Sequence, residues 1–200
     1  MTDIKTKKPR AATRERLLAA AEIEFAMGGF DGAKLADIAR RIGIRRPSLL
    51  YHFCSKAELY KATVERAFWQ LGETLGLGMT AQGSFEDRLR SMTTLFTDFL
   101  EQRPFLARLI IREILTEQGP GRDILISRVV PILDMVEDFI RKDGLEVIRD
   151  DLPVRAAVMQ SASSILMKNA SGSLQGSLWG PGDYSWPLTR SAFFEAKEES

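Results

Sequence analysis

The chain has 200 residues, of which 44% are hydrophobic and 28% are charged, a composition typical of a soluble globular protein. Its single cysteine excludes an intramolecular disulfide, and no apolar run approaches the roughly 20 residues that span a bilayer. The opening segment MTDIKTKKPR lacks the apolar stretch of a signal peptide, so we expect a cytoplasmic protein.

The net charge of +1 hides an uneven distribution along the chain. Residues 1–56 contain 12 Lys/Arg and 6 Asp/Glu, a net charge of +6, whereas residues 57–200 contain 16 and 21, a net charge of −5. Such an asymmetry indicates that the first segment binds a polyanion. On charge alone, a basic surface that is simply solvated is an equally good explanation.

The first half of the chain predicts four helices, because apolar residues recur at helical spacing and alternating strand patterns are scarce. The first begins at Thr13, a suitable N-cap, and ends at Gly28 and Gly29, where glycine can adopt the left-handed conformation. Ser55 and Glu58 form a predicted capping box at the start of the fourth. The predicted ranges are 13–29, 34–42, 46–53 and 55–78, and the glycines at 72, 76 and 78 weaken any continuation of the last.

The second half predicts five more helices, which makes an all-α fold of nine. A fifth helix follows Ser84 and stops before Pro104, and the sixth, PFLARLIIREIL, has so little polar face that we expect it to be central. Pro131 should kink the seventh. The last three are predicted at 123–142, at 154–171, and from about Pro187 onward.

The segment between residues 35 and 56 has the features of a helix-turn-helix. Gly43 supplies the positive φ of a sharp turn, Ala39 keeps the contact face small, and apolar residues fill the wedge between the two helices. In this motif the second helix enters the major groove of DNA. The alternative, a helical hairpin inside an ordinary bundle, requires Ala39, Gly43 and the basic face to coincide by chance.

The free face of that second helix carries groups suited to reading bases. Arginine hydrogen-bonds the edge of guanine, a hydroxyl group can donate to or accept from a base edge, and an apolar ring contacts the thymine methyl group. Around this face, cationic side chains and the open amides of the following helix suit phosphates, as do the lysines and arginine of the basic tail, residues 1–12. We expect base contacts from Arg46, Pro47, Ser48 and Tyr51, and phosphate contacts from Lys34, His52 and Lys56.

Over residues 13–69 the chain resembles the TetR family of bacterial transcriptional regulators. The segment GGFDGAKLADIARRIGIRRPSLLYHFCSKAEL contains the glycine-aromatic end of helix one, the DIA of helix two, the glycine turn and the aromatic-His-Phe-x-Ser-Lys entry to helix four. The resemblance implies these same DNA contacts. Arg45 lies next to the contact residues, at a position where the family commonly has a Ser that caps the helix. Ala33, Lys34 and Leu50 also depart from the family pattern, which bears on the operator sequence more than on DNA binding.

The resemblance also implies an overall organisation. Residues 1–56 would form a DNA-binding domain and residues 57–200 a helical ligand-binding and dimerisation domain, linked by the helix at 57–78. The resemblance further implies that the protein is a ligand-responsive repressor, which binds a palindromic operator as a homodimer. Small residues of the eighth helix and Leu188, Phe193 and Phe194 of the last would form the dimer surface, although the small residues fit an intramolecular core almost as well.

Other chemistry has less support in the sequence. His52 and Cys54 do not face each other on a helix, and no second His or Cys completes a metal site, so no metal or cofactor is expected and no enzyme motif is present. The alternative is a helical small-molecule carrier or enzyme whose helix-turn-helix segment does not bind DNA. An effector pocket is predicted from stripes of apolar residues on helices five to eight, namely Met92, Phe96, Phe99, Ile110, Met135, Phe139 and Met159.

Overall fold

The computed structural model describes residues 7–116 and 121–194, and this part of the chain is helical without any strand. The all-α prediction is confirmed. The ten α-helices of these residues are α1 (Lys7–Gly32), α2 (Leu35–Arg41), α3 (Arg46–His52), α4 (Lys56–Met79), α5 (Phe85–Glu101), α6 (Pro104–Leu115), α7 (Gly121–Asp143), α8 (Val154–Ala170), α9 (Gln175–Trp179) and α10 (Ser185–Phe193). The five-residue α9, which follows a short 3-10 turn, is the helix that the predicted nine lacked.

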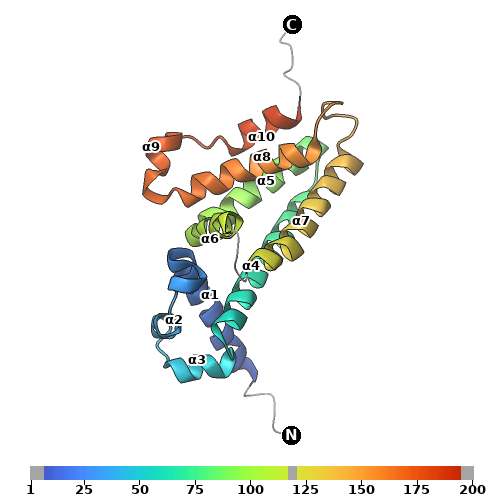
Figure 1. The fold of residues 1–200 in the computed structure, drawn as a ribbon. Coiled ribbons are helices and arrows are strands. Elements are labelled where there is room, and N and C mark those ends of the chain that lie inside the picture. Colours follow the sequence, from blue (N-terminus) through green and yellow to red (C-terminus); the bar gives the residue numbers. More distant parts are fainter. Residues whose placement is uncertain (1–6, 117–120, 195–200) are drawn as a thin grey trace.

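The helices form a small head and a larger body (Figure 1). The head consists of α1, α2 and α3, and α4 runs from it into the body, where it packs against α5 and α7. α6 lies between α1 and α8, and α8 and α10 run side by side at the far end of the body. The body therefore meets the head through two elements, α4 and α6. No helix in the described ranges has the length and apolar character needed to cross a membrane.

The head is built around aromatic rings contributed by α1 and α4. Phe25 and Tyr60 are fully buried and meet edge to face with ring centroids 4.7 Å apart, and Phe30 meets Tyr60 at 5.3 Å. Such pairs stabilise a core beyond their area of contact, by about 0.5–1.5 kcal/mol each. The rings thereby attach the beginning of α4 to the end of α1.

α1 differs from the predicted first helix at its start. It begins at Lys7 rather than at Thr13, so the assignment of Thr13 as the N-cap was wrong. The helix-forming residues KKPRAA continue it upstream, with Pro9 tolerated in the first turn. At the other end the prediction was correct, because Gly29 takes a positive φ of 67° and breaks the helical geometry there.

The helix starts at Ser55 and Ser84 both use side-chain caps. Ser84 and Asp87 form a complete capping box at the start of α5. At α4 the Ser55 hydroxyl accepts from the Glu58 amide at 3.0 Å, as predicted, but the Glu58 carboxylate accepts from the amide of Cys54 instead of that of Ser55. The predicted capping box was therefore half right.

The glycines of α4 do not end the helix where the sequence suggested weakening. α4 continues through Gly72, Gly76 and Gly78 to Met79. A Cβ on Gly78 would lie 2.7 Å from the Cα of Met92, so the absent side chain lets α4 approach the backbone of α5 closely. Close packing between the helices compensates for the low helix propensity of glycine.

Candidate nucleic-acid interface and effector cavity

The turn between α2 and α3 has the geometry that its sequence predicted. Gly43 has a φ of 74°, and nothing within 4 Å surrounds the place of a Cβ there, so glycine is needed for the backbone conformation and not for space. Ala39 is buried, and its carbonyl accepts from the amide of Ile44 at 3.0 Å. The tight turn thereby joins α2 to α3 through residues 42–45 alone.

α3 is anchored by one face and exposed on the other. Leu49 is completely buried in the head, whereas the predicted base-reading residues are all exposed, Tyr51 to 69%. Arg45 occupies the N-cap position in an extended conformation without a side-chain cap, and it is exposed as well. The exposed face therefore consists of Arg45, Arg46, Pro47, Ser48 and Tyr51.

The predicted phosphate-binding residues lie around this face but differ in their contacts. Lys34 is exposed at the N-cap of α2, and His52 is half-buried with its ring 5.7 Å from that of Tyr51. Lys56 donates from Nζ to the carbonyl oxygen of Asp31 at 2.9 Å and lies over the Phe30 ring. Lys56 therefore also fastens α4 to the end of α1, a role that the sequence did not suggest.

Two arginines of α1 contact the ends of the two helices of the helix-turn-helix. Arg16 donates to the carbonyl oxygen of Ile42 at 2.9 Å, and the guanidinium of Arg14 lies 5.0 Å from the centre of the Phe53 ring. They hold the ends of α2 and α3 against α1. Of the basic tail, residues 1–6 lie outside the described part of the chain.

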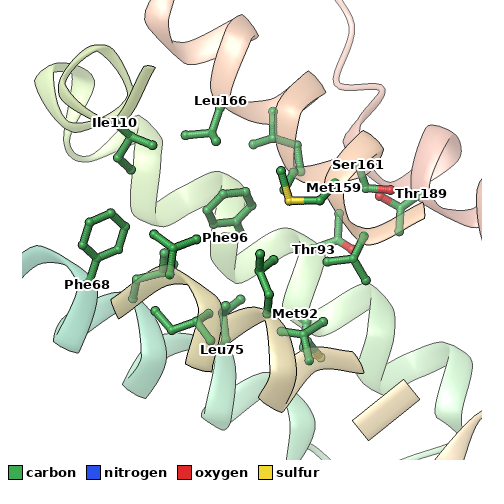
Figure 2. Close-up of a pocket in the computed structure, with 18 of the residues that line it drawn as sticks. Phe68, Leu75, Met92, Thr93, Phe96, Ile110, Met159, Ser161, Leu166 and Thr189 are labelled. Carbon is green, nitrogen blue, oxygen red and sulfur yellow. The ribbon is translucent and has the colours of Figure 1, made fainter. Parts of the chain in front are cut away.

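A cavity of about 360 Å³ lies inside the body, among α4, α5, α6, α7, α8 and α10 (Figure 2). Its volume falls in the range of roughly 300–1,000 Å³ typical of small-molecule pockets. Of the predicted pocket residues, Met92, Phe96, Ile110 and Met159 line it, and Figure 2 shows them turned toward a shared interior.

The other three predicted pocket residues do not line this cavity. Phe139 packs on Phe85 with ring centroids 5.5 Å apart, and Phe99 lies under the guanidinium of Arg103 at 4.6 Å. Met135 packs against the edge of the core. Periodicity identified these side chains as inward-facing but could not separate a residue that fills the core from one that borders a hollow.

Two helices outside the predicted helices five to eight also line the cavity. α4 supplies Phe68, Leu71 and Leu75, and α10 supplies Thr189 and Phe193. The apolar spacing of three and four residues in α4 is a readable signal of an inward face, but the predicted role of that helix was only to link two domains.

The cavity wall has almost no hydrogen-bonding capacity. Most of its residues are aliphatic or aromatic, and the hydroxyls of Thr93 and Thr189 donate to the carbonyl oxygens of Leu89 and Ser185 in their own helices. Because a charged group would lose its hydration there without a partner, the wall favours a hydrocarbon group.

Apolar side chains are exposed along α8, α9 and α10. Met167, Leu174, Leu178 and Leu188 are each at least half exposed. Phe193, by contrast, is almost completely buried in its own chain and borders the cavity, so its assignment to a dimer surface was wrong. Of the small residues of α8, Ser161 and Ala162 also border the cavity, which agrees with the intramolecular alternative for these two.

Comparison with known proteins agrees with this architecture. The sequence model described as bacterial regulatory proteins, tetR family, matches residues 17–63, which contain the helix-turn-helix. The HTH-type transcriptional activator FasR of Mycolicibacterium smegmatis is 33% identical over 143 residues, which make up 70% of this chain. The match spans 65% of FasR, slightly less than two thirds of that relative's length.

Solved structures resemble almost the whole described chain. The fatty acid degradation regulator FadR from Bacillus halodurans superposes with a TM-score of 0.74 at 14% identity, covering 88% of this chain and 92% of its own. FadR from Bacillus subtilis, solved in complex with stearoyl-CoA, has a TM-score of 0.69 at 15% identity and covers 89% and 94%. Helix-turn-helix, curated relative and fold agree, and the chain belongs to the tetR family of bacterial regulatory proteins.

Proposed function

We propose that the protein is a DNA-binding transcriptional regulator that acts as a homodimer and responds to an apolar effector. The observation that carries the proposal is the exposed face of α3, where Arg46, Ser48 and Tyr51 project from a helix held by a buried Leu49. Arg46 would bond a guanine edge in the major groove, while Lys34 and His52 would contact phosphates.

A homodimer is supported by the exposed apolar side chains of α8 and α10 and by the short length of α3. A seven-residue helix contacts few base pairs, so two copies about 34 Å apart on a palindromic operator would supply the affinity that one lacks. Exposed Met167 and Leu188 would be covered in such a pair.

An apolar effector is supported by the nearly pure hydrocarbon wall of the cavity. The Bacillus subtilis FadR, which has the same fold, was solved with stearoyl-CoA, a molecule that carries a long hydrocarbon chain. Because α4 borders the cavity and leads to the head, an occupant that shifts α4 would alter the separation of the two α3 helices. Moving the population from 1:99 to 99:1 needs an affinity difference worth about 5.5 kcal/mol between the two spacings.

The proposed function is tested by selecting DNA from a random pool with the purified protein. We expect an inverted repeat whose half-sites lie one helical turn apart, and an affinity that falls steeply with salt. Arg46→Ala should lose about 1–3 kcal/mol of discrimination at one base position, whereas Arg90→Ala, which removes an exposed arginine of α5, should leave it unchanged. Absent or salt-independent binding would favour a helical carrier or enzyme instead.

The direction of regulation is tested with a reporter gene behind the selected operator. As a repressor, the protein should lower expression until effector is added. Higher expression in its presence would instead assign the role of activator, which is the role named for FasR.

A further inference from the structure

The cavity reaches the surface of the body between three helices. Four of the side chains that border it are also 40–58% exposed, namely Ile114 of α6, Ile126 and Val130 of α7, and Met159 of α8. A side chain that borders a cavity and also meets solvent has no second layer of protein over it. The mouth of the cavity therefore lies where these three helices come together, and Figure 2 shows Met159 on its α8 side.

α7 is divided by a proline at this mouth. Pro131 lies inside the helix and has no amide hydrogen, so it cannot donate to the carbonyl oxygen of Ser127 as another residue would. Of residues 122–130, which precede the proline, Ile124 alone is buried. The part of α7 after the proline has three buried apolar residues. The first half of α7 is therefore packed less firmly than the second, and the two halves are joined at a weakened point.

Charged side chains hold the second half of α7 to its neighbours. Asp134 and Glu137 both bind Arg155 of α8. Asp143, the last residue of α7, binds Arg88 of α5, with Nη1 2.6 Å from Oδ2. Because these pairs connect the second half of α7 to two other helices, this half is expected to stay in place.

An exposed ion pair holds the first half of α7 to α4. Nη2 of Arg128 lies 2.8 Å from Oε1 of Glu65, and the Arg128 side chain is half exposed. An ion pair of this kind contributes little, because solvent screens its charges. Neither residue borders the cavity, so the pair forms in the same way whether the cavity is empty or filled.

We propose that the first half of α7, residues 122–130, is a gate through which an apolar molecule enters the cavity, with Pro131 as its hinge and the ion pair between Arg128 and Glu65 as its latch. Rotation at the hinge moves the α7 part of the wall outward and opens the cavity to solvent. The gate rests on the proposed function only in that the entering molecule would be the effector.

The latch is tested by the rates at which a probe enters and leaves. The probe is N-phenyl-1-naphthylamine, an uncharged fluorophore that emits in apolar surroundings, and stopped-flow fluorescence follows it. Arg128→Ala should raise the association and dissociation rate constants by the same factor, about 1.4–5, and leave the dissociation constant unchanged. Arg128→Glu combined with Glu65→Arg restores an ion pair and should restore the wild-type rates.

Arg141→Ala is the matched control for the latch. Arg141 is another exposed arginine of α7, and its ion pair with Glu137, at 2.7 Å, lies within the helix and after the hinge. Its loss should leave both rate constants unchanged. Equal effects of Arg128→Ala and Arg141→Ala, or a change of the dissociation constant without a change of the two rates, would overturn the gate.

The hinge is tested with Pro131→Ala. Alanine supplies an amide that can donate to the carbonyl oxygen of Ser127, so α7 becomes stiffer and both rate constants should fall by a common factor of about 2–13. Pro187→Ala is the control, because Pro187 lies in the first turn of α10, where an added amide has no acceptor within the helix. Rates that do not fall in Pro131→Ala, or that fall equally in Pro187→Ala, would contradict the hinge.

Thiol labelling tests where the probe enters. In a chain whose one cysteine is removed by Cys54→Ser, Ile126→Cys places a thiol at the mouth. Leu77→Cys places one at an exposed leucine of α4 that does not border the cavity. A bulky maleimide should slow entry and exit in the Ile126→Cys variant and leave them unchanged in the Leu77→Cys variant. A label that slows neither variant, or a wild-type protein that binds no probe, would overturn the gate.

These measurements contain no DNA, so the gate and the proposed function can fail separately. Rates that follow the expected pattern in a protein that selects no DNA would leave the gate in place while the proposed function fails. Selection of an inverted repeat by a protein whose rates ignore Arg128 and Pro131 would contradict the gate alone.

Discussion

Glu22 illustrates how much a single buried carboxylate can hold together. It lies on α1, and its Oε2 faces Arg66 of α4 and Arg103 of α6, so three helices meet at one side chain. The sequence alone does not indicate this, because nothing close to Glu22 in the chain distinguishes it from an ordinary polar position of a helix. Only the approach of two arginines from distant parts of the chain makes it a junction.

Glu22→Ala should destabilise the protein by about 3 kcal/mol, since it removes the carboxylate that faces the partly buried Arg103 and leaves Arg66 with only the exposed Glu15. Denaturation in urea, followed by circular dichroism, measures this change in the free energy of unfolding. Glu15→Ala is the matched control, because Glu15 binds the same Arg66 from α1 but is mostly exposed. It should cost no more than about 1 kcal/mol, and equal costs for the two variants would contradict the role given to Glu22.

At the scale of a single helix, α4 shows that glycine can mark close packing as well as a helix end. The sequence suggested that the glycines at 72, 76 and 78 weaken the helix, which is correct for an isolated helix. In the folded chain Gly78 faces Met92 at a distance that admits no side chain, whereas nothing lies within 4 Å of the place of a Cβ on Gly76. The two positions should therefore respond oppositely to the same substitution.

Gly78→Ala should destabilise the protein by about 1–3 kcal/mol, because the new methyl group would meet the backbone of α5 and force the helices apart. Gly76→Ala should stabilise it by about 0.5–1 kcal/mol, since alanine loses less backbone entropy in a helix. Thermal unfolding of both variants beside the wild-type protein measures the two changes. A stabilising Gly78→Ala would show that α4 and α5 do not approach as described.

α6 is the element whose character the sequence predicted least well. Its apolar residues indicated a central helix, and its contacts with α1, α5, α7 and α8 agree. Yet Leu115 is 76% exposed and Ile114 more than half exposed, while Glu113 is buried beside Tyr60, whose pKa is raised by burial and by that carboxylate. α6 contacts both the head and the body, and each of them buries a different part of its surface. A single stripe of apolar residues therefore does not describe which of its side chains are buried.

At the scale of the whole molecule, the exposed side chains of α8 and α10 make the proposed dimer testable. Leu188→Asp should weaken self-association by placing a carboxylate where apolar surface would otherwise be covered. Sedimentation velocity should then show a larger monomer fraction, and affinity for an inverted-repeat DNA should fall. Leu145→Asp, at a leucine between α7 and α8 that is 65% exposed against 50% for Leu188, is the control and should leave both unchanged.

The sequence by itself determined the helical class, most helix boundaries and which face of α3 is exposed. These features depend on neighbours close in the chain: apolar spacing, serine caps, and the glycine at 43 whose φ sets the turn. Tertiary structure alone decided which apolar residues border the cavity, that Phe193 is buried, and that Glu22 fastens α6 to the head. Each of these depends on distances between segments far apart in sequence, and periodicity within one helix carries no information about them.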